Sequence, residues 1–326
     1  MTEPAPADGW QVEQGIGEER ALLFRAGQPV AAQLRWPGSL EPGLVADAVL
    51  TERARGSARG VARFADGTEA VVSRLPGEAN EGAPIRLAIT RAAMGEAGRT
   101  KRAQARPTDA AVRPPLSLAE ALPHARVVRR FPAGAWEEAA NLAATGIADF
   151  AGGSLHFAAT PAMVVVDVDG HLPPRELALA AVPALARGIG LLGLGGNIGI
   201  DFPTLAAKPD RKALDAALGD ALGGIDHERT AMNGFGFVQI VMRLSRPSLL
   251  HCYHLDPAGA AARALLRQAE RLDGHGSIAL TAQPAIAARL GADWLAELRR
   301  RSGRAVAVTP DPALAPGAGH AQIVAP

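Results

Sequence analysis

The chain has 326 residues, 21% of them charged and 4% aromatic, with a formal net charge of +1. It is long enough for two or three compact units, and its near-neutral balance excludes a global basic field, so any nucleic-acid binding must come from local patches. A single cysteine, Cys252, excludes an intrachain disulfide framework. The chain has no run of about 18 apolar residues and no signal-peptide pattern at its start. We therefore expect a cytoplasmic protein without membrane contact.

The first third of the chain predicts short strands separated by turns, a pattern typical of a small barrel. Strands are expected at residues 20–24, 29–36, 45–51, 60–64, 70–73 and 85–90. The first two are expected to pair as a hairpin. A basic segment over residues 99–106 and a proline-rich linker over 107–115 follow, and the signal over 116–150 is weak and mainly helical.

The second half alternates predicted strands and helices, which is the rhythm of an α/β domain. Helices are expected at 175–187, from 210, at 257–272 and at 285–301, and strands at 163–168, 199–201, 238–244, 278–281 and 305–309. The last helix and its two flanking strands predict a βαβ unit. Residues 188–193 (GIGLLG) match G-x-G-x-x-G, but a helix precedes them and a strand follows, which excludes the dinucleotide fingerprint. We expect these glycines to form a flexible helix-to-strand connection.

Two apolar segments end in carboxylates, residues 163–170 (MVVVDVDG) and 199–202 (GIDF). If these are adjacent strands, their ends bring Asp167, Asp169 and Asp201 into one acidic cluster. The carboxylates repel one another, and a hard divalent cation offsets the repulsion; Mg²⁺ is usually held by one or two carboxylates together with substrate phosphates. Each aspartate alone fits a cap or turn equally well, whereas the three together favour metal-assisted phosphodiester hydrolysis.

Two further patterns contain residues that could bind a metal or a phosphate. Residues 251–254 (HCYH) have no second ligand pair at a suitable spacing, so they predict no zinc site. Arg229, Arg243 and Arg246 surround the glycine-rich segment 233–237 (NGFGF). Such a segment can approach a phosphodiester backbone closely, or it is simply a turn between strands with solvated arginines, and both interpretations stay open.

Several motifs occur in an order that is typical of one nuclease family. Residues 152–157 (GGSLHF) and 160–170 (TPAMVVVDVDG) resemble a G-G-S-[IL] run and a T-E-A-[LM] strand that ends in I-D-V-N-[ST]-G. Residues 194–202 (LGGNIGIDF) resemble L-G-G-x-I-x-I-D-F, and residues 228–249 resemble the strand and arginine-rich segment that follow. These are motifs of the ribonuclease E/G family, which the chain resembles over about residues 152–310 and more loosely in its N-terminal β unit.

The resemblance implies a mixed α/β (α+β) fold in three parts. Residues 1–107 would hold an oligonucleotide-binding (OB-fold-like) barrel together with ribonuclease-H-like remnants. Residues 108–151 would be a linker and reduced helical region, and residues 152–326 the α/β catalytic domain. By this resemblance the protein would be an endoribonuclease that cleaves single-stranded RNA with Mg²⁺, in RNA processing or decay.

The resemblance also assigns site residues. Asp167 and Asp201 match the family's two metal-binding aspartates, and Asp169 stands where the family has an active-site asparagine. Asp169 would be a third ligand or would position the attacking water. Arg229 matches an RNA-contacting arginine with a slip of one residue. Further RNA contacts are expected from Arg243, Arg246, Asn233, Lys101 and Arg102.

The chain departs from the family in ways that make it a short, reduced member. Pro161 stands where the family has a glutamate, and Asp169 replaces a neutral amide. The C-P-x-C zinc link that joins the family's subunits is absent, so no zinc is expected and any homo-oligomer would form without it. The region 107–151 is too short for the family's 5′-end sensing domain.

Two alternatives stay open. One is a catalytically degenerate RNA-binding protein of the same fold; Pro161 and Asp169 favour it, and the retained Asp167 and Asp201 oppose it. The other is a metal-dependent phosphoesterase with a substrate other than RNA, which would leave the N-terminal β unit and the basic patches without a purpose. A Mg²⁺ titration separates the first from a nuclease, because a pure binder binds RNA equally well in a chelator.

Overall fold

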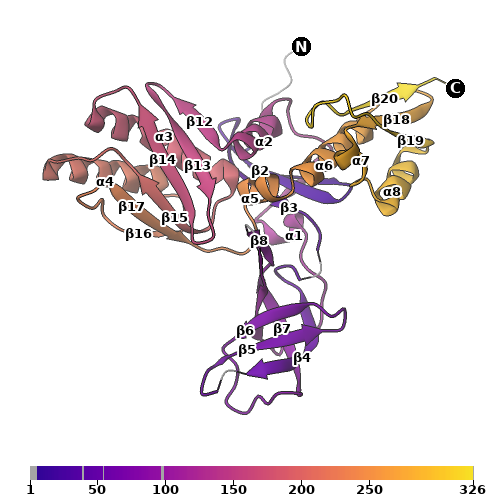
Figure 1. Ribbon diagram of the computed structural model, residues 1–326, viewed down its shortest axis with the longest axis horizontal. Coiled ribbons are helices and arrows are strands. Elements are labelled where there is room, and N and C mark those ends of the chain that lie inside the picture. Colours follow the sequence, from indigo (N-terminus) through magenta and orange to yellow (C-terminus); the bar gives the residue numbers. More distant parts are fainter. Residues whose placement is uncertain (1–5, 39, 54, 97–98, 326) are drawn as a thin grey trace.

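The computed structural model describes residues 6–325 except residues 39, 54, 97 and 98. Figure 1 shows a small barrel at the bottom, a sheet backed by helices on the left and a C-terminal α/β unit on the right. The fold is of the mixed α/β class that the sequence predicted. Among the described residues, no helix combines the length and the apolar character that crossing a bilayer requires.

Five strands close into a barrel in the order β10-β6-β5-β4-β7. Alternate residues along them, including Leu50, Val72 and Leu87, are buried and fill the interior. The predicted barrel is therefore present, and it lies within residues 45–107. Its strands are β4 (Val45–Arg53), β5 (Arg59–Phe64), β6 (Glu69–Ser73), β7 (Pro84–Arg91) and β10 (Ala103–Pro107).

The first strands lie outside the barrel. The predicted hairpin is confirmed as β2 (Glu18–Arg25) and β3 (Gln28–Arg35), which pair antiparallel. With β1 (Gly9–Gly15) and β11 (Arg126–Val127) they form a four-stranded sheet in the order β11-β1-β2-β3. Buried side chains of β2 and β3 belong to the main hydrophobic core, so this sheet packs on the larger α/β body. A short hairpin of β8 (Met94–Glu96) and β9 (Arg99–Lys101) precedes the last barrel strand.

The middle region is more than a linker. Its helix α2 (Ala135–Thr145) buries Trp136, Ala139 and Leu142 in the main core. A short helix, α1 (Leu118–Ala121), precedes it, and β12 (Ile147–Phe150) follows as the edge strand of the large sheet. Residues 135–150 therefore form part of the same body as the predicted catalytic domain, whereas Leu118 of α1 packs with Val12 and Ala21 in a separate small cluster.

The large sheet has six strands in the order β12-β13-β14-β15-β17-β16. The central pair, β14 (Val164–Gly170) and β15 (Gly196–Asp201), is parallel, and α3 (Pro174–Leu192) makes the crossover between them. One face is covered, because Val166 and Ile200 share a core with Leu185 of α3 and with Leu218 of α4 (Lys208–Leu222). The remaining strands are β13 (Gly153–Ala159), β16 (Glu228–Arg229) and β17 (Phe237–Met242).

The glycines at 188–193 do not form the flexible connection that we predicted, because α3 continues through them to Leu192. They allow close packing instead. A Cβ added at Gly188 would lie 2.5 Å from a ring carbon of Phe157, and one at Gly190 would lie 2.3 Å from the carbonyl oxygen of Val30. Gly193, with φ of 58°, ends the helix in the left-handed conformation.

Gly190→Ala is expected to destabilise the protein by roughly 1–3 kcal/mol, because the backbone of β3 must move to accept the methyl group. Gly219→Ala in α4 is the matched control, since its Cβ would meet only the Arg229 Nη2 atom at 3.4 Å. Alanine favours helix by about 1 kcal/mol over glycine, so this control should be neutral or stabilising. Urea unfolding followed by tryptophan fluorescence measures the free energy of unfolding of both variants. A Gly190→Ala variant as stable as wild type would contradict the close packing.

The C-terminal unit confirms the predicted βαβ pattern. β18 (Ser277–Ala282) and β19 (Val306–Pro310) pair parallel, and β20 (His320–Val324) adds on the other side of β18. The single helix expected over 285–301 is broken into α7 (Pro284–Ala287) and α8 (Ala292–Ser302). Helix α5 (Leu249–Leu255) and the predicted helix α6 (Pro257–Glu270) connect this unit to the rest of the chain.

Candidate active site on the open face of the six-stranded sheet

Asp167 and Asp201 are cross-strand partners in the parallel β14–β15 ladder. Their neighbours along the strands, Val166 and Ile200, point into the core. Because successive side chains on a strand alternate between faces, both carboxylates project from the opposite, uncovered face, where both are exposed. The two acids are thus adjacent at the carboxyl ends of neighbouring parallel strands, which is the juxtaposition that the sequence predicted.

Asp169 lies on the same face, two residues beyond Asp167, and its register partner on β13 is Ser154. One of its oxygens, Oδ1, accepts a hydrogen bond from the amide of Gly170 at 2.8 Å. Asp169 therefore stands in the next row of the sheet, and the sheet brings all three predicted carboxylates onto one face.

The open face carries polar groups that the sequence reasoning did not single out. His156 is the register partner of Asp167 on β13, and its Nε2 lies 2.9 Å from Oγ of Ser154. Asp149 on β12 pairs with Ser154 in the next row. The signal was present in the alternation of residues 153–159, in which Ser154 and His156 flank the buried Leu155.

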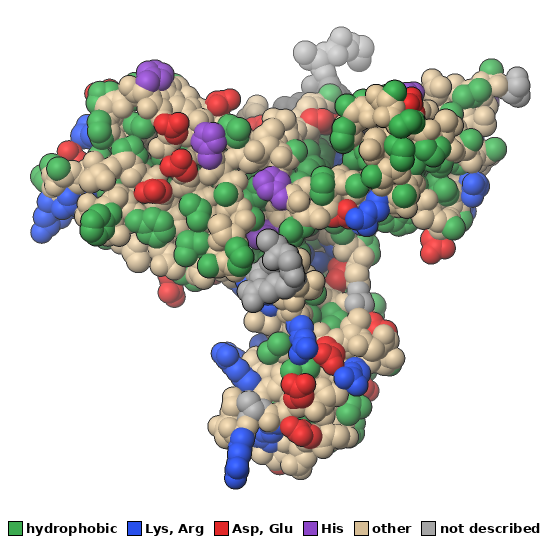
Figure 2. Space-filling view, viewed as in Figure 1, with side chains coloured by type: hydrophobic (Ala, Val, Ile, Leu, Met, Phe, Trp, Pro, Cys, Tyr) green, Lys and Arg blue, Asp and Glu red, His purple; other side chains and the backbone are tan. Residues whose placement is uncertain are grey.

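Two rows of polar side chains therefore cross the strands. One contains His156, Asp167 and Asp201, and the other contains Asp149, Ser154 and Asp169. Figure 2 shows acidic side chains and histidines gathered over this sheet on the face turned to the viewer. The carboxylates repel one another, so this face favours the binding of a cation or of a group that donates a proton.

The donor atoms at this face suit Mg²⁺. Carboxylate oxygens are its preferred protein ligands, and two carboxylates with waters and substrate phosphates are enough to hold it. Asp167 and Asp201 would supply these two. Within residues 6–325 as described, no three His, Cys, Asp or Glu side chains are grouped closely enough to hold a metal ion by themselves. The site fits a metal shared with substrate better than a metal cage made by protein alone.

Arg229 lies on the other side of the sheet. Its register partner is Ile240, whose side chain is buried in the core beneath the helices. The guanidinium donates to the carbonyl oxygen of Asp215 in α4 at 2.6 Å and pairs with the Asp215 carboxylate at 3.3 Å. We predicted that Arg229 contacts RNA, but its side chain lies on the covered face, where it binds Asp215 and holds α4 against the sheet.

Arg243 and Arg246 follow β17 at the end of the sheet away from Asp201. Phe237 pairs with Asp201, so six residues separate this row from Arg243, or about 20 Å at the strand rise. Arg246 is largely buried and pairs with Glu41 at 3.5 Å, and burial lowers its pKa. Both arginines line a cavity of about 750 Å³ beside β3 and the end of α3. They are therefore remote from the carboxylates.

The other predicted RNA contacts have structural partners. The Asn233 side-chain oxygen accepts from the amides of Phe235 at 2.9 Å and Phe237 at 3.0 Å and so builds the β16–β17 turn. Lys101 donates to the carbonyl oxygen of Pro161 at 2.9 Å, which links the β8–β9 hairpin to the loop before β14. Arg102 pairs with Glu69 of the barrel at 3.3 Å.

Residues 251–254 belong to α5, where Oγ of Ser248 caps the helix and lies 2.8 Å from Nδ1 of His251. Burial raises the pKa of the Cys252 thiol to about 12. A thiol with so high a pKa is almost never a thiolate at neutral pH, so Cys252 has no nucleophilic role.

No protein-family model matches the chain, and no curated protein sequence matches it significantly.

Proposed function

We propose that this chain is a Mg²⁺-dependent endoribonuclease that cleaves single-stranded RNA in the cytoplasm, as its resemblance to the ribonuclease E/G family implies. The observation that carries the proposal is the register pair of Asp167 and Asp201 on the open sheet face. An adjacent pair of exposed carboxylates at the ends of parallel strands suits a cation that is shared with a phosphodiester. The five-stranded barrel, which would be of the OB-fold type, supplies a second surface for the RNA strand.

In the proposed reaction, Asp167 and Asp201 would hold Mg²⁺ over the sheet beside the scissile phosphate. When bound there, Mg²⁺ would acidify a water and neutralise charge that develops on the phosphate. Asp169, one row further, would orient the attacking water or add a ligand. His156 lies beside Asp167 and is held by Ser154, so it is positioned to take up or release a proton at the same face.

The RNA strand would extend from the barrel to the open face of the sheet. Arg63 is 57% exposed and Arg102 is 51% exposed, and both lie beside Glu69. Figure 2 shows several Lys and Arg side chains on the visible side of the barrel. Such groups bind phosphates without reading sequence, so we expect an affinity that falls steeply as salt rises.

The test is cleavage of a 5′-labelled, AU-rich single-stranded RNA by the purified chain, with Mg²⁺ and with a chelator. We expect internal cuts that require Mg²⁺. The same RNA is used in a gel-shift assay, where binding should persist in the chelator but be weaker than with Mg²⁺, because a metal at Asp167 and Asp201 would add a contact to the phosphate. Binding without cuts at any Mg²⁺ concentration would overturn the nuclease proposal and favour the degenerate RNA-binding protein. Absence of both would remove RNA as the ligand.

A further inference from the structure

Phe235 is the most exposed large hydrophobic residue among those described. Its side chain is 86% exposed, whereas the next in rank, Val127, is 58% exposed. A single exposed apolar side chain is common on protein surfaces, so what distinguishes Phe235 is where the turn places it. It lies at the tip of the turn between β16 and β17, where no other side chain covers it.

The turn fixes the backbone that carries the ring. The Phe235 amide donates to Asn233 Oδ1 at 2.9 Å, and its carbonyl oxygen accepts from Oγ1 of Thr204 at 3.3 Å. Gly236, with φ of 95°, sits so close to the next segment that a Cβ there would lie 2.3 Å from the carbonyl oxygen of Phe202. Only glycine allows this approach. The ring is therefore presented by a braced backbone rather than by a loose loop.

The turn lies against the chain that leaves the acidic site. The Phe202 amide, directly after Asp201, donates to the Gly236 carbonyl oxygen at 3.1 Å. Phe237, two residues beyond Phe235, is the register partner of Asp201, and its ring lies over Gly199 on the open face. One aromatic ring thus lies on the acidic face, and a second projects at its edge.

We propose that Phe235 is a stacking platform for one unpaired nucleobase of single-stranded RNA, next to the phosphate held at Asp167 and Asp201. This inference rests on the proposed function and names how its substrate is positioned. Carboxylates repel a phosphate backbone, but a neutral planar base is attracted to an exposed aromatic face. Stacking on one ring strengthens binding by roughly 5- to 150-fold per base and tolerates any base. The base stacked on Phe235 would determine which phosphate of the RNA lies at Asp167 and Asp201.

The test measures binding in a chelator, so that it does not depend on cleavage. The probe is an oligouridylate of about ten nucleotides, within the usual range of single-strand site sizes. We expect Phe235→Ala to weaken its binding about tenfold and Phe235→Trp to restore it, with the new indole fluorescence quenched by the RNA. Val127→Ala, which removes another exposed apolar side chain, is the control and should bind as wild type does.

A set of oligouridylates with one abasic position each locates the stacked base. At that position the abasic probe should bind wild type about tenfold more weakly and should bind Phe235→Ala with no further loss, because both changes remove the same contact. With Mg²⁺, cuts by Phe235→Ala should spread over neighbouring phosphates. Equal binding by wild type and Phe235→Ala would overturn this inference and leave the nuclease proposal intact. A Phe235-dependent affinity without cleavage would overturn the nuclease proposal and keep the stacking platform.

Discussion

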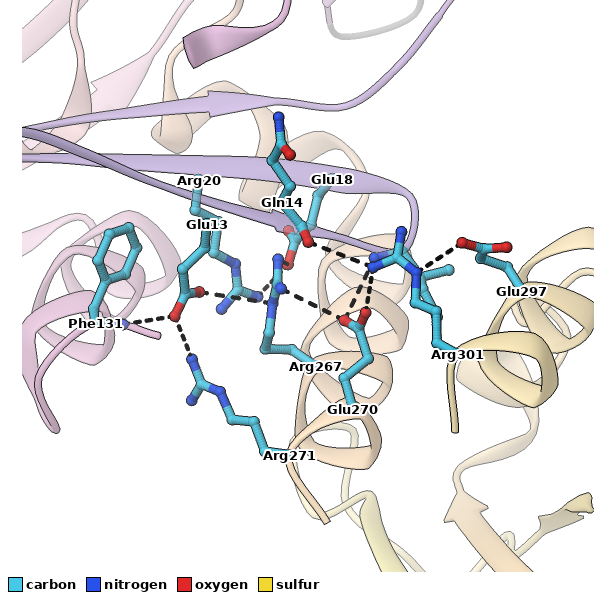
Figure 3. A network of polar contacts seen from close by, with 11 residues as sticks. Glu13, Gln14, Glu18, Arg20, Phe131, Arg267, Glu270, Arg271, Glu297 and Arg301 are labelled. Carbon is cyan, nitrogen blue, oxygen red and sulfur yellow. Dashed lines mark hydrogen bonds and ion pairs between the residues drawn. The ribbon is translucent and has the colours of Figure 1, made fainter. Parts of the chain in front are cut away.

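Glu13→Ala is expected to destabilise the protein by roughly 3–5 kcal/mol, because it removes one partner from a buried ionic network. The Glu13 side chain on β1 is fully buried. Its Oε1 accepts from the amide of Phe131 at 2.7 Å and from Nη2 of Arg271 at 2.8 Å. Figure 3 shows a chain of contacts that runs from Glu13 through Arg267 and Glu270 to Arg301 of α8.

Arg267 shows why the loss would be large. Burial lowers its pKa first, neighbouring Arg20 lowers it further, and the carboxylates around it oppose the shift. Glu13 lies 3.7 Å from Nε of Arg267. Without Glu13, the buried guanidinium groups of Arg20 and Arg267 would repel each other with less negative charge nearby to offset the repulsion. The same contacts join the β1–β2 sheet to α6 and α8, so we expect the C-terminal unit to loosen from the body.

Urea unfolding followed by tryptophan fluorescence measures this effect. The four tryptophans, Trp10, Trp36, Trp136 and Trp294, all lie outside the barrel, so the signal reports on the body and the C-terminal unit. The matched control is Glu138→Ala, which breaks the solvent-exposed pair of Glu138 on α2 with Arg187 on α3 in the body. Exposed pairs contribute little, so the control should unfold at the wild-type midpoint. A Glu13→Ala midpoint equal to wild type would contradict a stabilising role for the network.

The main elements of the fold could be predicted because their patterns are local. The apolar run that ends at Asp167 and the short run that ends at Asp201 are typical of buried strands, and the helical signal between them indicates a parallel crossover. From these, the adjacency of the two carboxylates follows. The βαβ unit at the C-terminus was predictable for the same reason.

What the sequence could not provide was the face on which each side chain lies. Arg229 and Asp201 both belong to strands of the same sheet, but only the strand register shows that they point in opposite directions. The glycines of α3 were misassigned because helix propensity counts against them, whereas tertiary packing on Val30 and Phe157 requires them. The pair of Glu13 and Arg271 is separated by 258 positions and leaves no local pattern.

Asp167→Asn and Asp201→Asn should each lower the cleavage rate by about a thousandfold, because a metal that stabilises a phosphoryl transition state contributes several kcal/mol. The two act as one unit through their register contact, so the double variant should be no slower than the slower single variant. RNA binding in a chelator should be unchanged or tighter, since each substitution removes a negative charge near the phosphates. This pattern separates a lost metal site from a lost fold.

Asp169→Asn tests one of the departures from the nuclease family that the chain resembles. It restores a neutral amide one row away from the carboxylate pair, where Asp169 Oδ1 already accepts from its own neighbour's amide. We expect this variant to cleave within about tenfold of wild type, because the remaining pair suffices for Mg²⁺. Asp226→Asn, the same change of charge on the exposed segment after α4, serves as the control and should have no effect. An inactive wild type with an active Asp169→Asn variant would show that the third carboxylate blocks the site, and a fully active Asp201→Asn variant would show that the open face is not where the phosphate is cut.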